Sequence, residues 1–199
     1  MSHLEKDPVG AKLGMWLFLF TELILFGGLF ILYAVYLTDY PKEFSSGGRQ
    51  LDVVFGTTNT VVLLTSSLFA AMAVTAVKRG ERRATLGLLC GTLACAATFL
   101  AIKYLEWSAK FHHGIYPNAP RLRTGPPGES VFFGLYYLTT GLHGIHVLVG
   151  GALITWICVM VKRGVVNAED NVALENVTLY WHLVDLIWIF IFPLYYLIL

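Results

Sequence analysis

The chain has 199 residues, of which 56% are hydrophobic and only 14% are charged, and its mean hydropathy is +0.65. These values exclude an ordinary soluble globular domain, in which about a quarter of the residues are charged. The formal net charge of +1 gives no argument for a nucleic-acid partner, because the basic residues form short clusters and not one extended patch. The composition therefore predicts an integral membrane protein.

Five long apolar stretches follow one another, at residues 13–37, 53–77, 84–109, 130–161 and 177–199. Each is near or above the ~20 residues that a membrane-spanning helix needs. Because they leave little room for a soluble domain, we expect one all-α membrane domain over residues 1–199, built as a bundle of five tilted transmembrane helices. The first stretch is too long for the core of a cleavable signal, so we expect it to be retained as a span.

The basic residues of the connections predict the orientation of the bundle, since short cytoplasmic loops collect Lys and Arg. With the amino terminus inside, the inner side holds eight basic residues: Lys6, Lys12, Lys78, Arg79, Arg82, Arg83, Lys162 and Arg163. The outer side then holds five: Lys42, Arg49, Lys110, Arg121 and Arg123. We therefore expect the amino terminus inside and the carboxyl terminus outside.

Two connections on the expected outer side are rich in residues that break helices. The segment from Thr38 to Asp52 holds a proline and a Ser-Ser-Gly-Gly run, which predicts an irregular loop. The segment from His112 to Glu129 holds four prolines and two arginines, and we expect it to pack over the outer surface or against a partner. The three cysteines fall within spans without CxxC spacing and are interpreted as small buried apolar residues: Cys90, Cys95 and Cys158.

The first span carries a carboxyl group deep in the membrane. Glu22 lies about nine residues into the stretch, which places it ~14 Å into a hydrocarbon layer ~30 Å thick. A carboxylate at that depth is costly, so Glu22 is expected to face protein or water and not lipid. Two interpretations stay open: a proton-linked group, or a carboxyl that makes a hydrogen bond between helices.

Histidines occur in the last two spans. His143 and His146 lie three positions apart, on one helical face, in span four. Two histidines at this spacing are able to ligate a metal, but haem and copper centres need more ligands, so hydrogen bonding between helices is favoured and no metal site is expected. In span five, His182 and Asp185 are also three apart, with a tryptophan on either side of the carboxyl. A polar contact between helices is favoured there over proton transfer.

The second and third spans carry further polar residues. Glu106 and Lys103, near the outer end of span three, are expected either to pair or to extend toward the lipid headgroups. Asn59 and Ser66 share a face of span two and suit helix packing. Since the chain shows neither a nucleophile with its base nor a phosphate-binding glycine motif, no catalytic residue is assigned.

Four motifs, taken together and in this order, resemble subunit III of the haem-copper oxidases. They are GMWLFLFTELILF with Glu22, KYLEW with Glu106, TTGLHGIHVLVG with His143 and His146, and YWHLVDLIW with His182 and Asp185. The resemblance covers essentially the whole chain. The fuller form of that family has seven spans, and this chain resembles the five-span form that begins at the third family helix. The resemblance implies the same orientation as the count of basic residues.

The resemblance implies a non-redox accessory subunit of a proton-pumping terminal oxidase in aerobic respiration, set in a prokaryotic inner membrane or its organellar equivalent. The implied partners are oxidase subunit I, subunit II, further respiratory subunits and membrane lipids. Haem and copper are then expected in those partners, with no cofactor in this chain besides bound phospholipid. The implied role is to stabilise the catalytic subunit and to support proton uptake, with Glu22 at the family's membrane-embedded carboxylate. Lys103 receives no role.

Three alternatives remain open at this point. Within the same family, the chain resembles the subunit III-like companion of a nitric oxide reductase. From a different class, an autonomous proton-coupled transporter would use Glu22, His143 and Asp185 along one path, although such transporters usually show paired repeats and broken helices, which this sequence lacks. A stand-alone haem or metal protein using His143, His146 and His182 is the third, and a metal-free, colourless purified chain would exclude it.

Overall fold

The computed structural model describes residues 7–117 and 119–197. Its elements are α1 (Pro8–Asp39), α2 (Pro41–Arg49), α3 (Val53–Lys78), α4 (Arg82–His112), α5 (Pro120–Thr124), α6 (Pro127–Lys162), α7 (Val172–Phe192) and a π-helical turn, η1 (Pro193–Leu197). Five of these helices, α1, α3, α4, α6 and α7, are long and apolar enough to cross a membrane, and the described residues hold no strand. The prediction of an all-α, five-span bundle is confirmed. Lys6 and residues 198–199 of the expected fifth span lie outside the described residues.

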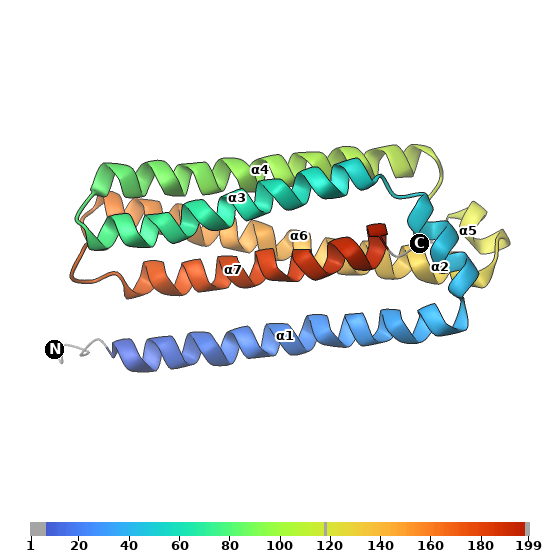
Figure 1. The fold of residues 1–199 in the computed structure, drawn as a ribbon, viewed down its shortest axis with the longest axis horizontal. Coiled ribbons are helices and arrows are strands. Elements are labelled where there is room, and N and C mark those ends of the chain that lie inside the picture. Colours follow the sequence, from blue (N-terminus) through green and yellow to red (C-terminus); the bar gives the residue numbers. More distant parts are fainter. Residues whose placement is uncertain (1–6, 118, 198–199) are drawn as a thin grey trace.

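The spans form a ring of four helices with a fifth at its side. α3 packs against α4 and α7, and α6 packs against the same two helices, while α1 lies along α6 and α7 (Figure 1). Successive spans run in opposite directions, so the bundle has two distinct ends. We call the end with the α3–α4 and α6–α7 connections the basic end, and the end with α2, α5 and η1 the cap end (Figure 1).

The basic end is closed by two tight turns. α3 and α6 are each followed, after one capping residue, by a glycine with positive φ, Gly80 at 74° and Gly164 at 75°. In this conformation the next N–H groups, those of Glu81 and Val165, donate to carbonyls near the helix ends at 3.0 Å, which completes the hydrogen bonding of the last turns. The guanidinium of Arg82 then donates to the Lys162 carbonyl, and this bond ties the two turns together.

The cap end contains more helix than the sequence predicted. The segment 38–52, expected to be irregular, holds α2, which begins with Pro41 in its first turn, where a missing N–H costs nothing. Its glycines are buried against the start of α6, and a Cβ on Gly47 would lie 2.4 Å from the Phe132 ring. Phe44 packs edge-on against Phe132 and Tyr33, with ring centroids 5.3 and 5.1 Å apart. Tertiary packing therefore overrides the weak helix propensity of this segment.

The proline-rich segment 112–129 also departs from a purely irregular loop. It holds the short helix α5 and the first turn of α6, and each of these begins with a proline. Leu122 of α5 and the neighbouring Ala119 are buried. The segment therefore packs on the bundle, as one of the two sequence expectations proposed.

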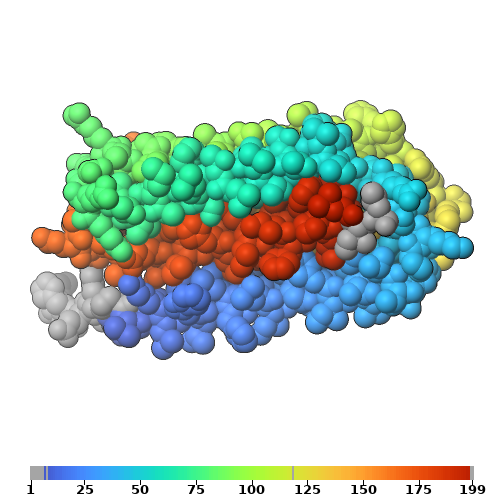
Figure 2. Space-filling view, viewed as in Figure 1, coloured from blue at the N-terminus to red at the C-terminus, as the bar shows by residue number. Residues whose placement is uncertain are grey.

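α1 packs against the bundle along one side only (Figure 2). Polar contacts at three levels attach it there. At the basic end the Lys12 ammonium lies 2.7 Å from the Glu175 carboxylate of α7. Near the middle Glu22 contacts His146 of α6. At the cap end the Tyr33 hydroxyl donates to the Leu194 carbonyl at 2.7 Å. Such contacts are effective in lipid, where no hydrophobic force draws helices together.

Candidate functional site

The membrane-embedded carboxyl group of α1 pairs with a histidine of α6. The Glu22 Oε2 and His146 Nε2 atoms lie 2.8 Å apart, and the two side chains are 14% and 13% exposed. The His146 ring lies edge-on to Phe26, and the Tyr180 hydroxyl donates to the His146 carbonyl at 3.2 Å. Glu22 thus faces protein, as its cost in lipid requires.

The second ring nitrogen of His146 fixes the chemistry of this pair. Its Nδ1 lies 2.8 Å from the Leu142 carbonyl oxygen, which only accepts hydrogen bonds, so Nδ1 carries a proton. The 2.8 Å contact between Nε2 and Glu22 then holds one proton. It is either on the ring, which gives an imidazolium and a carboxylate, or on the carboxyl, which gives a neutral pair. The hydrogen bond between Glu22 and His146 is therefore kept whichever of the two side chains holds this proton.

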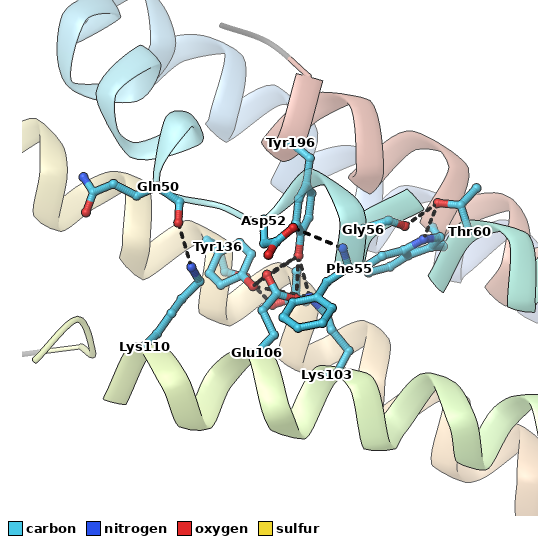
Figure 3. A network of polar contacts seen from close by, with 12 residues as sticks. Gln50, Asp52, Phe55, Gly56, Thr60, Lys103, Glu106, Lys110, Tyr136 and Tyr196 are labelled. Atoms are coloured by element: carbon cyan, nitrogen blue, oxygen red, sulfur yellow. Dashed lines mark hydrogen bonds and ion pairs between the residues drawn. The ribbon is translucent and has the colours of Figure 1, made fainter. Parts of the chain in front are cut away.

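A second polar cluster lies buried near the cap end (Figure 3). Lys103 and Glu106, one turn apart on α4, form an ion pair with 2.9 Å between Nζ and Oε2. The Tyr136 and Tyr196 hydroxyls, from α6 and η1, donate to Glu106 Oε1 at 2.8 and 2.7 Å. Lys103 Nζ also donates to the Tyr196 oxygen at 2.7 Å. Of the two expectations for Lys103 and Glu106, the structure shows pairing, because both point into the bundle and away from the headgroups.

The cap end is linked to this region by a second lysine of α4. Lys110 Nζ donates to the Gln50 carbonyl at 3.0 Å (Figure 3). The Gln50 side-chain amide donates in turn to Glu129 at 3.1 Å. These bonds connect the end of α4 with the α2–α3 connection and the first turn of α6. Polar contacts on α4 thus hold the cap in place.

Span five presents its polar residues to α3. The Ser66 hydroxyl lies 3.4 Å from Asp185 Oδ2, a long hydrogen bond, and accepts a second bond from the Trp181 ring nitrogen at 3.0 Å. The neighbouring Ser67 hydroxyl lies 2.6 Å from His182 Nδ1. Asp185 is almost fully buried, whereas His182 is half-buried. Sequence alone pointed to a polar contact between helices here, but it did not indicate which residues of α3 would make it.

His143 differs from its expected role. It is fully buried, and neither of its ring nitrogens has a hydrogen-bond partner among the described residues. Its ring packs instead against those of Phe99 and Trp188, at centroid distances of 5.4 and 5.2 Å. The expected hydrogen bond from His143 to another helix is not present among the described residues. Asn59 of α3 is likewise buried, with both amide atoms unpaired within the described part of the chain.

The residues of the transporter hypothesis are not joined into one path. Glu22 contacts α6 at the side of the bundle, whereas Asp185 contacts α3, and no hydrogen bond links either of them to His143 among the described residues. The metal-protein alternative also lacks a site in the described ranges, where no group of three His, Cys, Asp or Glu side chains is placed to hold an ion. The polar residues thus form several separate contacts between neighbouring helices.

Comparison with known proteins identifies the family of this chain. The family model for cytochrome c oxidase subunit III matches residues 2–198. The chain belongs to the cytochrome c oxidase subunit III family. This match confirms the resemblance that the four sequence motifs indicated.

Curated relatives of the subunit III family span several kinds of oxidase. The chain is 30% identical over its full length to cytochrome c oxidase subunit 3 of Thermostichus vulcanus, covering 92% of that protein. It is also 30% identical to quinol oxidase subunit 3 of Bacillus subtilis, over 93% of this chain and 85% of the relative. A match of 32% identity covers 97% of this chain but only 23% of a haem-copper oxidase subunit I+III from Aeropyrum pernix.

Several residues of these contacts were missed by sequence reasoning. Tyr136, Tyr196 and Ser67 were not singled out, whereas Lys103 was expected to pair with Glu106 or to extend toward the headgroups. The pairing of Lys103 with Glu106 has a signal in their spacing of three residues. The tyrosines have none, because their distances from Glu106 along the chain, 30 and 90 residues, follow no helical period.

Proposed function

We propose that this chain is the non-redox accessory subunit of a haem-copper terminal oxidase, where it stabilises the catalytic subunit and supports its proton uptake. The observation that carries the proposal is the family match over residues 2–198, together with relatives of similar length that are named as oxidase subunits. Haem and copper belong to the partner subunits, and electrons enter the complex from cytochrome c or from quinol, the two donors in the relatives' names.

The Aeropyrum pernix relative supports a direct contact with subunit I. Its name joins subunits I and III in one protein, and this chain matches about a quarter of it. The surface of this chain offers room for such a partner, because α1 exposes a row of large apolar side chains in the membrane, among them Leu13, Leu17, Phe20 and Ile24. Subunit I covers part of this apolar surface, and phospholipid chains cover the rest.

The bundle is placed in the membrane with its basic end inside, so the amino terminus is inside and the carboxyl terminus outside. Seven of the eight basic residues counted for that side lie within the described residues and stand at or beside the helix ends of the basic end: Lys12, Lys78, Arg79, Arg82, Arg83, Lys162 and Arg163. Clusters of Lys and Arg in short connections favour the cytoplasmic side. The membrane is a prokaryotic inner membrane or its organellar equivalent.

Glu22 is the proton-linked residue of the proposal. Its contact with His146 holds a single proton in either of two positions, and both side chains are partly exposed at the side of the bundle. Replacing Glu22 by Gln removes the ionisable group but keeps an amide that is able to hydrogen-bond with His146 Nε2. We expect Glu22→Gln to assemble normally and to slow proton uptake at high turnover, because the pair no longer exchanges a proton.

The test uses the purified complex with a pH-sensitive dye and an oxygen electrode, with cytochrome c and quinol each supplied as donor. Asp39→Asn is the matched control, since Asp39 is an exposed carboxyl at the cap end of the same helix. Proton uptake by Glu22→Gln equal to wild type at every pH would make Glu22 a structural residue. A complex that keeps its stability and proton uptake after complete removal of this chain would contradict the accessory role itself.

A further inference from the structure

A groove between α3 and α7 opens near the basic end. It has a volume of about 320 Å³ and is lined by Ala71, Val74, Glu175, Thr178, Leu179 and His182. Three of the six lining residues carry polar side chains, although the groove lies between two membrane-spanning helices. Glu175 and His182 are seven residues apart on α7, so they share a helical face over about two turns, or ~10 Å.

The mouth of the groove is charged. The Glu175 carboxylate lies 2.7 Å from Lys12 Nζ and 2.6 Å from Lys78 Nζ, so residues of α1, α3 and α7 meet here. The two lysine side chains are about half exposed, at 48% and 52%. Charged groups at this exposure are hydrated, because an ion pair in hydrocarbon without water carries a large desolvation cost. Water therefore reaches the start of the groove.

The far end of the groove leads to a buried carboxyl. His182 lines the groove and contacts Ser67 at 2.6 Å, and Asp185 stands one turn further along α7, beside Ser66. Asp185 Oδ2 lies 3.4 Å from the Ser66 hydroxyl, and its Oδ1 has no hydrogen-bond partner among the described residues. A buried carboxyl oxygen without a partner is expensive, so native proteins satisfy such atoms with protein groups or with bound water.

We propose that the α3–α7 groove is filled with water that reaches His182 from the basic end and continues to Asp185 Oδ1. His182, Ser67, Ser66 and Asp185 then form the polar wall of a half-channel that is open at one end of the bundle only. The half-channel binds water. Through this water the Asp185 carboxyl exchanges its proton with the aqueous phase at the basic end. Glu22 lies outside this route, at the contact between α1 and α6.

Further buried polar atoms without a hydrogen-bond partner among the described residues lie beyond Asp185. Trp188, one turn further on, donates to Thr60 at 3.0 Å, next to the unpaired Asn59, and its ring contacts the unpaired His143. These atoms need partners for the same reason as Asp185 Oδ1. The functional meaning of the half-channel, a supply of protons from the basic end, rests on the proposed function, but the presence of water in the groove does not.

Cysteine labelling tests the proposal in the assembled complex. Cys90, Cys95 and Cys158 are first replaced by alanine, and single cysteines are then placed in the groove as Ala71→Cys and His182→Cys. Leu68→Cys on α3 and Leu186→Cys on α7 are matched controls, since these side chains are 57% and 44% exposed but do not line the groove. A charged, membrane-impermeant methanethiosulfonate reagent reacts with thiolates, which form only where water is present.

We expect both groove cysteines to react at least about tenfold faster than both controls when the reagent is added at the basic end, and not when it is added at the cap end. Equal, slow reaction of all four cysteines, with labelling only by a lipid-soluble maleimide, would mean that lipid chains fill the groove and would overturn the proposal. Reaction at Ala71→Cys alone in an assembled complex would also overturn it, because water would stop short of His182. The labelling needs no oxygen reduction, so it can fail while the accessory role stands.

Discussion

The buried Lys103–Glu106 pair makes a quantitative prediction about stability. Glu106 is 2% exposed and accepts hydrogen bonds from Lys103, Tyr136 and Tyr196, at 2.7–2.9 Å for the shortest bond from each. In the variant Glu106→Leu the Lys103 ammonium remains buried, with only the two phenol oxygens at 2.7 and 3.3 Å as partners. Removing one partner of a buried ion pair costs about 3–5 kcal/mol, because it leaves an uncompensated charge. We expect a loss of that size.

The double variant Lys103→Leu/Glu106→Leu separates the charge effect from the loss of packing. It leaves no buried charge without a partner, so we expect it to lose less than half of what Glu106→Leu alone loses. The measurement is the midpoint of thermal unfolding of the subunit in the purified complex, with Glu81→Leu, an exposed carboxyl before the same helix, as the control that changes little. A double variant as unstable as the sum of the two single variants would refute this reasoning.

Three further changes test the contacts of α7 and η1 with α6, α1 and α3, each by the same unfolding midpoint. A Cβ at Gly150 would lie 2.7 Å from the Trp181 ring, whereas a Cβ at Gly151 meets its nearest neighbour at 3.9 Å. Gly150→Ala should therefore be less stable than Gly151→Ala by about 1–3 kcal/mol. Equal stabilities of the two variants would contradict the close contact. Tyr33→Phe leaves the Leu194 carbonyl unpaired and should cost about 1 kcal/mol, unlike Tyr104→Phe at an exposed position. Lys78→Ala leaves Glu175 paired with Lys12, so it should lower the stability by ~1 kcal/mol or less. This loss of stability should disappear in ~1 M salt. A large loss that does not depend on salt would be inconsistent with an ion pair at the membrane surface.

The number and type of the spans were predictable because the bilayer sets a fixed length for apolar helices. The helices extend past the predicted stretches where capping groups are available. Asp7, for example, accepts hydrogen bonds from the N–H groups of Val9 and Gly10, so α1 begins directly after it and not at residue 13. The cap end was less predictable, since α2 is stabilised by Phe44 and Phe132, residues far apart in the sequence.

The polar residues of the candidate site were likewise predictable only in part. Because a charge in lipid is costly, Glu22 was expected to face protein. Its partner His146 is 124 residues away along the chain, however, and no sequence period connects the two. His143 lies on the same helix, three residues earlier, and packs among aromatic rings without a hydrogen bond to the described residues. A side chain's type therefore predicts that it needs a partner, whereas the three-dimensional packing decides which residue that partner is.

The accessory role is tested most directly by purifying the tagged chain in mild detergent and recording a reduced-minus-oxidised haem spectrum and oxygen consumption on the material that co-purifies. We expect haem and oxygen reduction in the complex, and neither in this chain after it has been stripped from its partners. A chain that purifies alone and colourless from native membranes, with no haem protein attached, would contradict membership of an oxidase complex. Haem that stays with the stripped chain would contradict its non-redox character.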